Sequence, residues 1–485
     1  MTPGLSRLWV ALFMGYLAVA GGHLYTADDW SRFHSARSFL LYFSPEVPDL
    51  PHVYGVQGSE GRIVSHFPPG LSMAVLPLLA AGHAVGWWVP DRQEMLERAA
   101  CSLLNQVVVA WLMTLLYRLL SCTGAAPRTR LRLTLVAAFG TLAFPYAKHF
   151  WAEPLQAALL VAALLQLRAI STGDRGARRY GLFSSALAAA LLVKYETVIP
   201  AAVLLAGVAV MARPRGLARW AALTAPWFGV ALVLGAYNAW RFGSPLELGY
   251  GVVSPQPAPV AEASLSPMTM LRRLALLLLS PGQGLFVFVP LTALAFVRAL
   301  RPSPHRVLRF GYVAGLATML LYVVLDRSST WCWGPRYLFL PMILWWPALA
   351  GVPRSFRGSF AVLAGAGVVI AVLGVLVNFH DAIEEIRVSR GYTGWEWVDH
   401  VQREPDLSPL IWHARLVWPY LKRTVEDASR VSEPAEAPVM WRHRHVDVLW
   451  LALWVGGASP PILAVPVLLI GLALWQLRLL SRDLA

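Results

Sequence analysis

Two adjacent carboxylates, Asp28 and Asp29, follow the first long apolar run of the sequence. A general base must lie within hydrogen-bond reach of the proton that it removes, and a carboxylate at the mouth of a helical bundle suits that role. Aspartate in the first turn of a helix also stabilises exposed backbone N–H groups. Apolar and aromatic residues recur at helical spacing in 30–43, directly after the pair. The residues alone therefore leave two interpretations open, a catalytic base and a helix cap, and the cap is the commoner use of such a pair.

Ionisable and polar side chains at the ends of apolar runs form a second candidate set. A charge near the centre of a bilayer costs at least about 2.5–3.5 kcal/mol, so such residues often carry function. The cations come from distant parts of the chain but fall at the same expected membrane level, and a convergent basic site suits a phosphate carried by a lipid. Alternatively, each side chain reaches the headgroups separately as an anchor. The set comprises Lys148, His149, Glu153, Lys194, Tyr195, Arg336 and Tyr337.

The composition places these residues in a membrane protein. Of the 485 residues, 57% are hydrophobic and 14% are charged, whereas a soluble chain averages about 25% charged residues. The net charge of +14 comes from arginines clustered between apolar runs, which is typical of cytoplasmic membrane loops and not of a nucleic-acid site. Cys101, Cys122 and Cys332 lie far apart in the sequence and have no metal-site spacing, so we expect neither a disulfide nor a metal site built on them.

The apolar runs predict an all-α polytopic protein with about twelve transmembrane helices. Each run has roughly the length of a spanning helix, ~17–25 residues. The expected spans are 8–24, 98–120, 131–149, 152–169, 180–195, 197–212, 219–238, 283–300, 307–325, 336–352, 359–379 and 447–477.

The segment 69–89 is apolar enough to span, and the charge of a neighbouring loop decides its placement. If it spans, Arg128, Arg130 and Arg132 fall on the outer side; if it lies in the interface, they fall inside with the other arginine clusters. The positive-inside rule favours an interfacial or re-entrant helix in the first outer loop. The apolar run 274–282 is likewise expected to be an interfacial or re-entrant segment.

With the amino terminus inside, three larger loops face outward, 25–97, 239–282 and 380–446. We expect a transmembrane catalytic module over 1–379, an outer-face region over 380–446, and a final transmembrane helix with a cytoplasmic tail over 447–485.

The loop 380–446 mixes charges with Trp395, Trp397, Trp412 and Trp418. Residues 407–421 have helical spacing and predict an amphipathic helix lying on the membrane. A solvated loop that caps the bundle is the alternative.

The chain carries no phosphate-binding loop, dinucleotide fingerprint, zinc spacing or serine-hydrolase elbow. A nucleotide-driven pump or a nucleotide-sugar enzyme is therefore not indicated.

The order of several short motifs resembles the GT-C fold glycosyltransferases, which use lipid-linked sugars, and within them the bacterial branch of aminoarabinose and protein O-mannosyl transferases. The resemblance covers most of 1–350. It is carried by Ala27-Asp-Asp-Trp-Ser-Arg-Phe-His-Ser-Ala-Arg, Gly61-Arg-Ile-Val-Ser-His-Phe-Pro-Pro-Gly, Trp151-Ala-Glu-Pro-Leu, Tyr237-Asn-x-x-x-Phe-Gly-Ser-Pro, Ser280-Pro-Gly-Gln-Gly-Leu-Phe and Trp333-Gly-Pro-Arg-Tyr-Leu. The chain departs from the family at Asp29, where relatives carry Glu, and at Phe67, where they often carry Lys.

The resemblance implies that a sugar passes from a polyprenyl-phosphate carrier to a glycan, lipid or protein acceptor of the cell envelope. The first-loop acid would be the general base, Asp28 with Asp29 as the alternate, and Glu153 would support it. Lys194, Arg336, Lys148 and His66 would stabilise the departing phosphate. One direct displacement would invert the anomeric centre, and the residues do not settle whether a divalent cation takes part.

The expected location is the inner (plasma) membrane, with the multi-pass protein surrounded by lipid and its active site facing the periplasm or exterior. Two other functions remain open at this point. A transporter or lipid flippase without transferase activity would also need buried ionisable groups. A structural subunit of an envelope-assembly complex could use 380–446 to dock a partner.

Overall fold

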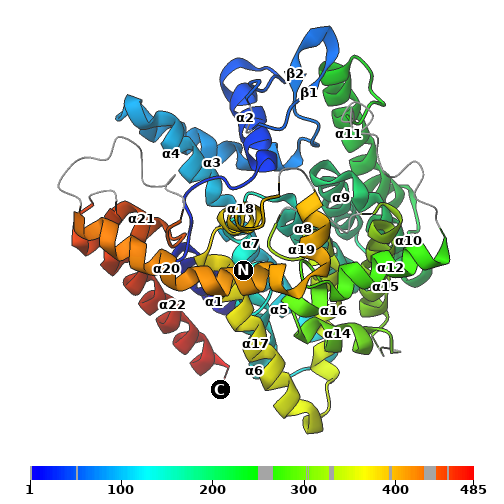
Figure 1. Cartoon of the computed structure of the whole chain (residues 1–485). Coiled ribbons are helices and arrows are strands. Elements are labelled where there is room, and N and C mark those ends of the chain that lie inside the picture. Colours follow the sequence, from blue (N-terminus) through cyan, green and yellow to red (C-terminus); the bar gives the residue numbers. More distant parts are fainter. Residues whose placement is uncertain are drawn as a thin grey trace.

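The computed structural model describes residues 3–50, 53–249, 266–301, 303, 305–326, 332–392, 396–430, 444–455 and 458–484. Helices make up nearly all of its regular structure, as Figure 1 shows. The described part contains a single two-stranded sheet. The all-α class expected from the sequence is confirmed.

The first helix and the first outer loop form the part of the fold that carries the acidic pair. Thr26 begins the second helix because its hydroxyl accepts the N–H of Asp29, so the chain turns sharply after the first apolar run. Between the second and third helices the loop folds into an antiparallel hairpin that pairs Val56 with Val64. The elements are α1 (Pro3–Leu17), α2 (Ala27–Tyr42), β1 (Val56–Gln57), β2 (Ile63–Val64), α3 (Gly70–Gly86) and α4 (Gln93–Ser102).

Helices α3 and α4 form a hairpin that projects at the upper left of Figure 1, and glycines permit its close packing. A Cβ atom at Gly82 would lie 2.8 Å from the carbonyl oxygen of Leu96 on α4. A Cβ atom at Gly70 would lie 2.5 Å from the carbonyl oxygen of Leu192, where α3 begins against the next layer. The segment 69–89 is thus a helix with fixed neighbours, and its interfacial placement stays a prediction.

The core of the bundle is built around α8, which packs against α5, α9, α10, α15 and α16. Its buried positions combine alanines with leucines, and side chains of different size allow dense packing from several sides. The central helices are α5 (Leu104–Leu120), α6 (Pro127–Phe139), α7 (Ala143–Tyr146), α8 (Ala152–Ser171), α9 (Ala177–Val193), α10 (Val198–Met211) and α11 (Leu217–Phe242). The later ones are α12 (Pro267–Leu279), α13 (Leu285–Phe288), α14 (Leu291–Ala299), α15 (Arg306–Val324), α16 (Phe339–Trp345) and α17 (Arg357–Leu376).

Within the described residues, six helical stretches are long and apolar enough to cross a membrane by length and composition, so the count of about twelve spans stays a prediction. Proline and glycine explain several differences between the expected spans and the helices of the structure. The run 131–149 breaks at Gly140 into α6 and α7, and Pro290 separates α13 from α14. The six stretches are Pro90–Thr123, Ala152–Ser171, Leu217–Phe242, Arg306–Val324, Gly358–Leu376 and Pro460–Asp483.

The region 380–446 is largely helical where the structure describes it. Its helices lie against the end of α17 and against the segment that leads into the last helix. Trp395 and 431–443 lie outside the described residues. The elements are α18 (Phe379–Arg390), α19 (Glu396–Arg403) and α20 (Pro409–Arg430), followed by α21 (Leu449–Val455) and α22 (Ala464–Asp483). All three cysteines are buried and free.

Candidate active site

The two adjacent carboxylates at the start of α2 have different surroundings. Asp29 is fully buried and completes a capping box with Thr26. One of its carboxylate oxygens accepts the backbone N–H groups of Tyr25 and Thr26, each at 3.1 Å. The capping role that the sequence left open therefore belongs to Asp29.

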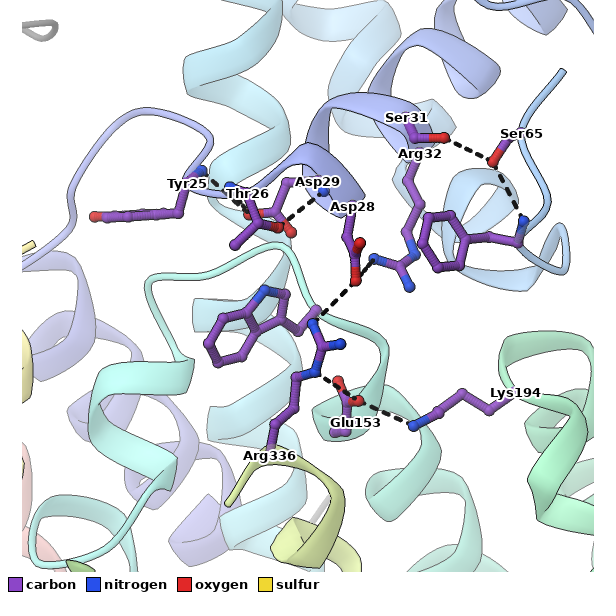
Figure 2. A network of polar contacts seen from close by, with 12 residues as sticks. Tyr25, Thr26, Asp28, Asp29, Ser31, Arg32, Ser65, Glu153, Lys194 and Arg336 are labelled. Carbon is purple, nitrogen blue, oxygen red and sulfur yellow. Dashed lines mark hydrogen bonds and ion pairs between the residues drawn. The ribbon is translucent and has the colours of Figure 1, made fainter. Parts of the chain in front are cut away.

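Asp28 points from the same turn toward two arginines, one on α2 itself and one from a distant segment, as Figure 2 shows. Its carboxylate accepts a hydrogen bond from Arg336 Nη1 at 3.0 Å. Arg32, one turn along α2, places its own Nη1 3.9 Å from the same oxygen. The side chain of Asp28 keeps 23% of its surface exposed, whereas that of Asp29 has none. Of the two, Asp28 is the carboxylate that an entering molecule could reach.

Arg336 and Lys194 extend the network through Glu153, at the first turn of α8. Lys194 Nζ lies 3.0 Å from Glu153 Oε1, and Arg336 Nε lies 3.6 Å from the same oxygen. Arg336 thus stands between Asp28 and Glu153, and Figure 2 shows the four side chains in a row. Four segments of the chain meet here: the first turns of α2 and α8, the turn after α9, and the 3₁₀ turn Arg336–Leu338 before α16.

Aromatic rings enclose the two cations of this row. Lys194 Nζ lies 4.9 Å from the ring centre of Tyr337 and 5.7 Å from that of Tyr322. The guanidinium of Arg336 lies 5.5 Å from the ring centre of Trp151. Rings at this distance attract a cation and keep water from it, so the charges interact in a medium of low dielectric constant.

The loop after β2 forms the wall opposite Asp28. Arg32 lies over the ring of Phe67, 3.7 Å from its centre, and its Nη1 makes no hydrogen bond among the described residues. Arg241, fully buried at the end of α11, donates to the carbonyl oxygens of Ser65 and Phe67. His66 lies between these two residues, with its ring centre 3.9 Å from that of Phe67. The Lys that relatives often carry at this point is thus replaced by an aromatic ring that supports an arginine.

The surroundings shift the pKa values of the two carboxyls in opposite directions. Burial alone would raise the pKa of Asp28, but Arg336, Arg32 and His66 outweigh it and hold the pKa below its usual range. Burial raises the pKa of Asp29 to about 6, against the opposing effect of Arg32. At neutral pH Asp28 is ionised. Its affinity for a proton depends on how close Arg336 and Arg32 lie to its carboxylate.

The structure divides the residues expected at the site into groups. Asp28, Glu153, Lys194, Arg336 and Tyr337 come together, and His66 is close enough to act on Asp28 electrostatically. These five residues with Arg32 are called the charged row below.

Tyr195 faces a neighbouring group. Its hydroxyl donates to Asn238 at 3.4 Å, and Asn238 also accepts from Arg241. Tyr195 thus belongs to the network that supports the wall.

Lys148 and His149 belong to a second buried cluster. Lys148 Nζ lies 2.9 Å from the Asp447 carboxylate and donates to the carbonyl oxygen of Val375 at 2.7 Å. His149 stacks on Trp151, with ring centres 4.0 Å apart, and also contacts Tyr25. Because Asp447 engages the ammonium group of Lys148, this cation is already paired within the fold.

Three contributors were not singled out from the sequence. Arg32 had a usable signal, because it follows Asp28 at the i,i+4 spacing that pairs charges on a helix. Arg241 and Asp447 had none, since the contact of Arg241 with Phe67 spans 174 residues and that of Asp447 with Lys148 spans 299. No group of three metal-ligating side chains occurs among the described residues.

Comparisons with known proteins place the chain at some distance from characterised ones. No protein-family model matches it, and neither does any curated protein. Two solved structures of ArnT from Cupriavidus metallidurans match at 14% sequence identity. The apo structure gives a TM-score of 0.47 over 99% of this chain and 76% of that one. The structure bound to undecaprenyl phosphate gives 0.46 over 96% and 88%. ArnT is a GT-C glycosyltransferase, the group that the motifs of this chain resemble. At such identity the likeness concerns the course of the chain and not its activity.

Proposed function

We propose that this protein is a membrane glycosyltransferase that moves a sugar from a polyprenyl-phosphate carrier to an envelope acceptor. The observation that carries the proposal is the charged row, in which the partly exposed carboxylate of Asp28 shares a network with three cations, of which Arg336 and Lys194 come from distant segments of the chain. A transfer reaction from a lipid phosphate needs one group to take a proton and several to hold negative charge. The charged row contains both.

Asp28 is the base in this proposal, and Asp29 is the residue that fixes the helix on which Asp28 stands. Asp29 uses its carboxylate on backbone N–H groups, whereas the polar contacts of Asp28 are with the side chains of Arg336 and Arg32. An acceptor hydroxyl can replace such a side chain without breaking the helix cap. The acceptor then lies within hydrogen-bond reach of Asp28.

The reaction is one displacement. The acceptor oxygen forms a bond to the anomeric carbon, its proton passes to Asp28, and the bond from that carbon to the phosphate oxygen breaks. The electron pair of that bond stays on the polyprenyl phosphate, which leaves as an anion. Attack from the side opposite the phosphate inverts the anomeric centre.

Arg336, Lys194 and Arg32 stabilise the anion as it forms. Arginine suits phosphate because its planar group offers parallel N–H donors. Glu153 holds Arg336 and Lys194 together, and its ionic contacts keep both ammonium and guanidinium groups in place before substrate arrives.

Arg336 also links donor binding to the strength of the base. In the structure Arg336 lowers the pKa of Asp28. A bound phosphate would share the guanidinium and weaken its contact with Asp28, so the pKa of Asp28 would rise toward neutral and its carboxylate would become a better base. The base thus strengthens when the donor is present.

The two neighbouring acids provide a matched test. Asp28→Asn should lower sugar transfer by a factor of about 10²–10⁴, the usual contribution of a general base. Asp29→Asn should retain most of the activity, because one amide oxygen can accept both backbone N–H groups that Asp29 now binds with a single oxygen. Full-length variants are produced in a strain lacking the gene, and envelope glycans are followed by mass spectrometry. Thermal unfolding in detergent checks that both variants fold.

Two results would contradict the assignment. If the Asp28→Asn variant folds and transfers sugar at the full rate, Asp28 is not the base. If the Asp29→Asn variant folds but transfers no sugar, the catalytic role belongs to Asp29. The same mass spectra identify donor and acceptor, because loss of the gene should leave the charged carrier accumulated and one sugar missing from the glycans. Movement of a labelled lipid-linked sugar in vesicles without a glycosylated product would instead indicate a flippase. The proposed location is the plasma membrane, with the charged row on its outer side.

A further inference from the structure

Helix α20 is held against the protein by one face only. His413, Tyr420 and Thr424 are buried on that face. Tyr420 packs in a small cluster with Val377, just after the end of α17, and with Val446 and Val448, just before α21. The helix is therefore a fixed part of the fold over these turns.

The opposite face is exposed and divided lengthwise into two stripes. Ile411, Trp418 and Val425 are seven residues apart, so they lie nearly in line along the helix, and Trp418 is 70% exposed. Leu421, also exposed, borders them on one side. The other side of the exposed face carries the cations Arg415, Lys422 and Arg423, and with them Glu426, whose carboxylate lies 3.7 Å from Lys422 Nζ. An apolar stripe beside a basic stripe is the pattern of a helix that lies in a membrane surface.

The neighbours of α20 place it at the end of apolar spans. Only 22% of the most apolar segment of α17 is buried inside the protein. In the stretch Pro460–Asp483 the buried share of the corresponding segment is 6%. These two helices therefore present most of their apolar surface outward, as helices in contact with lipid do. Helix α20 packs on the Leu376 end of α17 and on α21, which leads into α22, and Figure 1 shows it crossing both.

We propose that α20 is an interfacial helix that docks on the membrane leaflet at the Leu376 end of α17. The stripe Ile411–Trp418–Val425 enters the boundary of the acyl chains, about 5–10 Å deep, where tryptophan is favoured. Arg415, Lys422 and Arg423 contact phosphate groups of anionic lipids. A phospholipid surface explains both stripes, since it offers an apolar layer directly beneath a layer of negative charge.

This docking would hold a second feature of the fold in place. Ser408, next to the start of α20, donates to the carbonyl oxygen of Pro281 at 2.6 Å. Ser280 donates to the carbonyl oxygen of Gln402 at 2.7 Å. A Cβ atom at Gly282 would lie 2.6 Å from the Val401 carbonyl oxygen, so glycine is required for this contact. The Ser280–Pro–Gly turn between α12 and α13 is thus fastened to the segment that α20 anchors.

The depth of single positions tests the proposal without knowledge of the substrate. Trp418→Cys and Glu426→Cys are made in the full-length protein, spin-labelled, and reconstituted in nanodiscs of phosphatidylcholine with or without phosphatidylglycerol. Both positions are exposed and lie on different sides of the same face, and Glu426→Cys removes only an exposed ion pair with Lys422, so neither change should disturb folding. Cys101, Cys122 and Cys332 are buried, and the unsubstituted protein gives their background.

The expected result is that the label at 418 is accessible to oxygen and shielded from a water-soluble nickel complex, whereas the label at 426 shows the reverse. Phosphatidylglycerol should increase the depth at 418, and the triple variant Arg415→Gln, Lys422→Gln, Arg423→Gln should abolish that increase. Equal exposure of both labels to the nickel complex would overturn the docking. Spin–spin broadening at 418 would indicate a second copy of the chain instead, and an absent lipid effect would overturn the contact with anionic headgroups.

Discussion

The buried pair of Lys148 and Asp447 provides a stability prediction whose size follows from the structure. The Lys148 side chain is 1% exposed and that of Asp447 is 10% exposed, with 2.9 Å between Nζ and a carboxylate oxygen. His23 Nε2 lies 2.9 Å from the other oxygen. The Asp447 carboxylate is therefore engaged through both of its oxygens.

Asp447→Asn removes the counter-charge but leaves the ammonium group buried. Breaking a buried pair in this way costs about 3–5 kcal/mol, because the remaining charge is neither solvated nor compensated. Lys148→Met should cost a similar amount, since it leaves Asp447 with His23 alone. The double variant should be destabilised by much less than the sum of the two, because neither buried charge remains.

Reversible unfolding of the purified protein in mixed micelles, followed by circular dichroism during titration with sodium dodecyl sulfate, measures these differences. The pair of Arg7 and Asp483 is the matched control, since it also joins residues far apart in the sequence but its side chains are 34% and 49% exposed. Asp483→Asn should cost less than about 1 kcal/mol. The reasoning is refuted if Asp447→Asn lowers the free energy of unfolding no more than Asp483→Asn does. It is also refuted if the double variant loses as much stability as the two single variants together.

Two further predictions concern the segment that carries the acidic pair. The pKa of Asp29 is raised to about 6 in the folded protein, whereas an unfolded aspartate ionises near 3.9, so the folded state holds a proton that the unfolded state has lost between these values. The stabilisation from Asp29 is complete below pH 4 and is lost as the pH rises through 6, by on the order of 3 kcal/mol. Unfolding titrations at pH 4 to 7 should show a flatter profile for Asp29→Asn than for the wild type, and identical slopes would contradict the buried position of this carboxyl. Gly21→Ala should destabilise the protein by about 1–3 kcal/mol in the same assay, because the new Cβ atom would lie 1.7 Å from the Tyr25 hydroxyl oxygen. Gly229→Ala, with no atom within 4 Å of the new Cβ, should be neutral or stabilising, and equal losses at both glycines would count against the packing around Tyr25.

The charged row shows how far spacing along a helix can predict contacts. Asp28 and Arg32 are one turn apart, and their proximity follows from helical geometry once 27–42 is known to be a helix. The pairing of Asp28 with Arg336 spans 308 residues and depends on how α2 and the turn before α16 are brought together. A single sequence holds no local signal for such a contact.

The division of labour between Asp28 and Asp29 illustrates the same limit. Adjacent residues on a helix point about 100° apart, so one of the two had to face the preceding turn while the other faced away. Thr26 three residues before Asp29 matches the capping-box spacing, with Asp in place of Glu or Gln, and this pattern was available in the sequence. Which neighbours Asp28 would meet on the other side was not available.

The sequence by itself determined that the chain is a helical membrane protein, because so large an apolar fraction in long runs has no other stable arrangement, and it marked several of the ionisable groups that the fold buries. It did not determine which of those groups share a site. Lys148 and Lys194 look alike in the sequence, each at the outer end of an apolar run, yet Lys194 pairs with Glu153 in the charged row and Lys148 pairs with Asp447 elsewhere. Only the packing of helices distant in the sequence decided this, because a buried charge takes whichever partner the tertiary structure brings within a few ångströms.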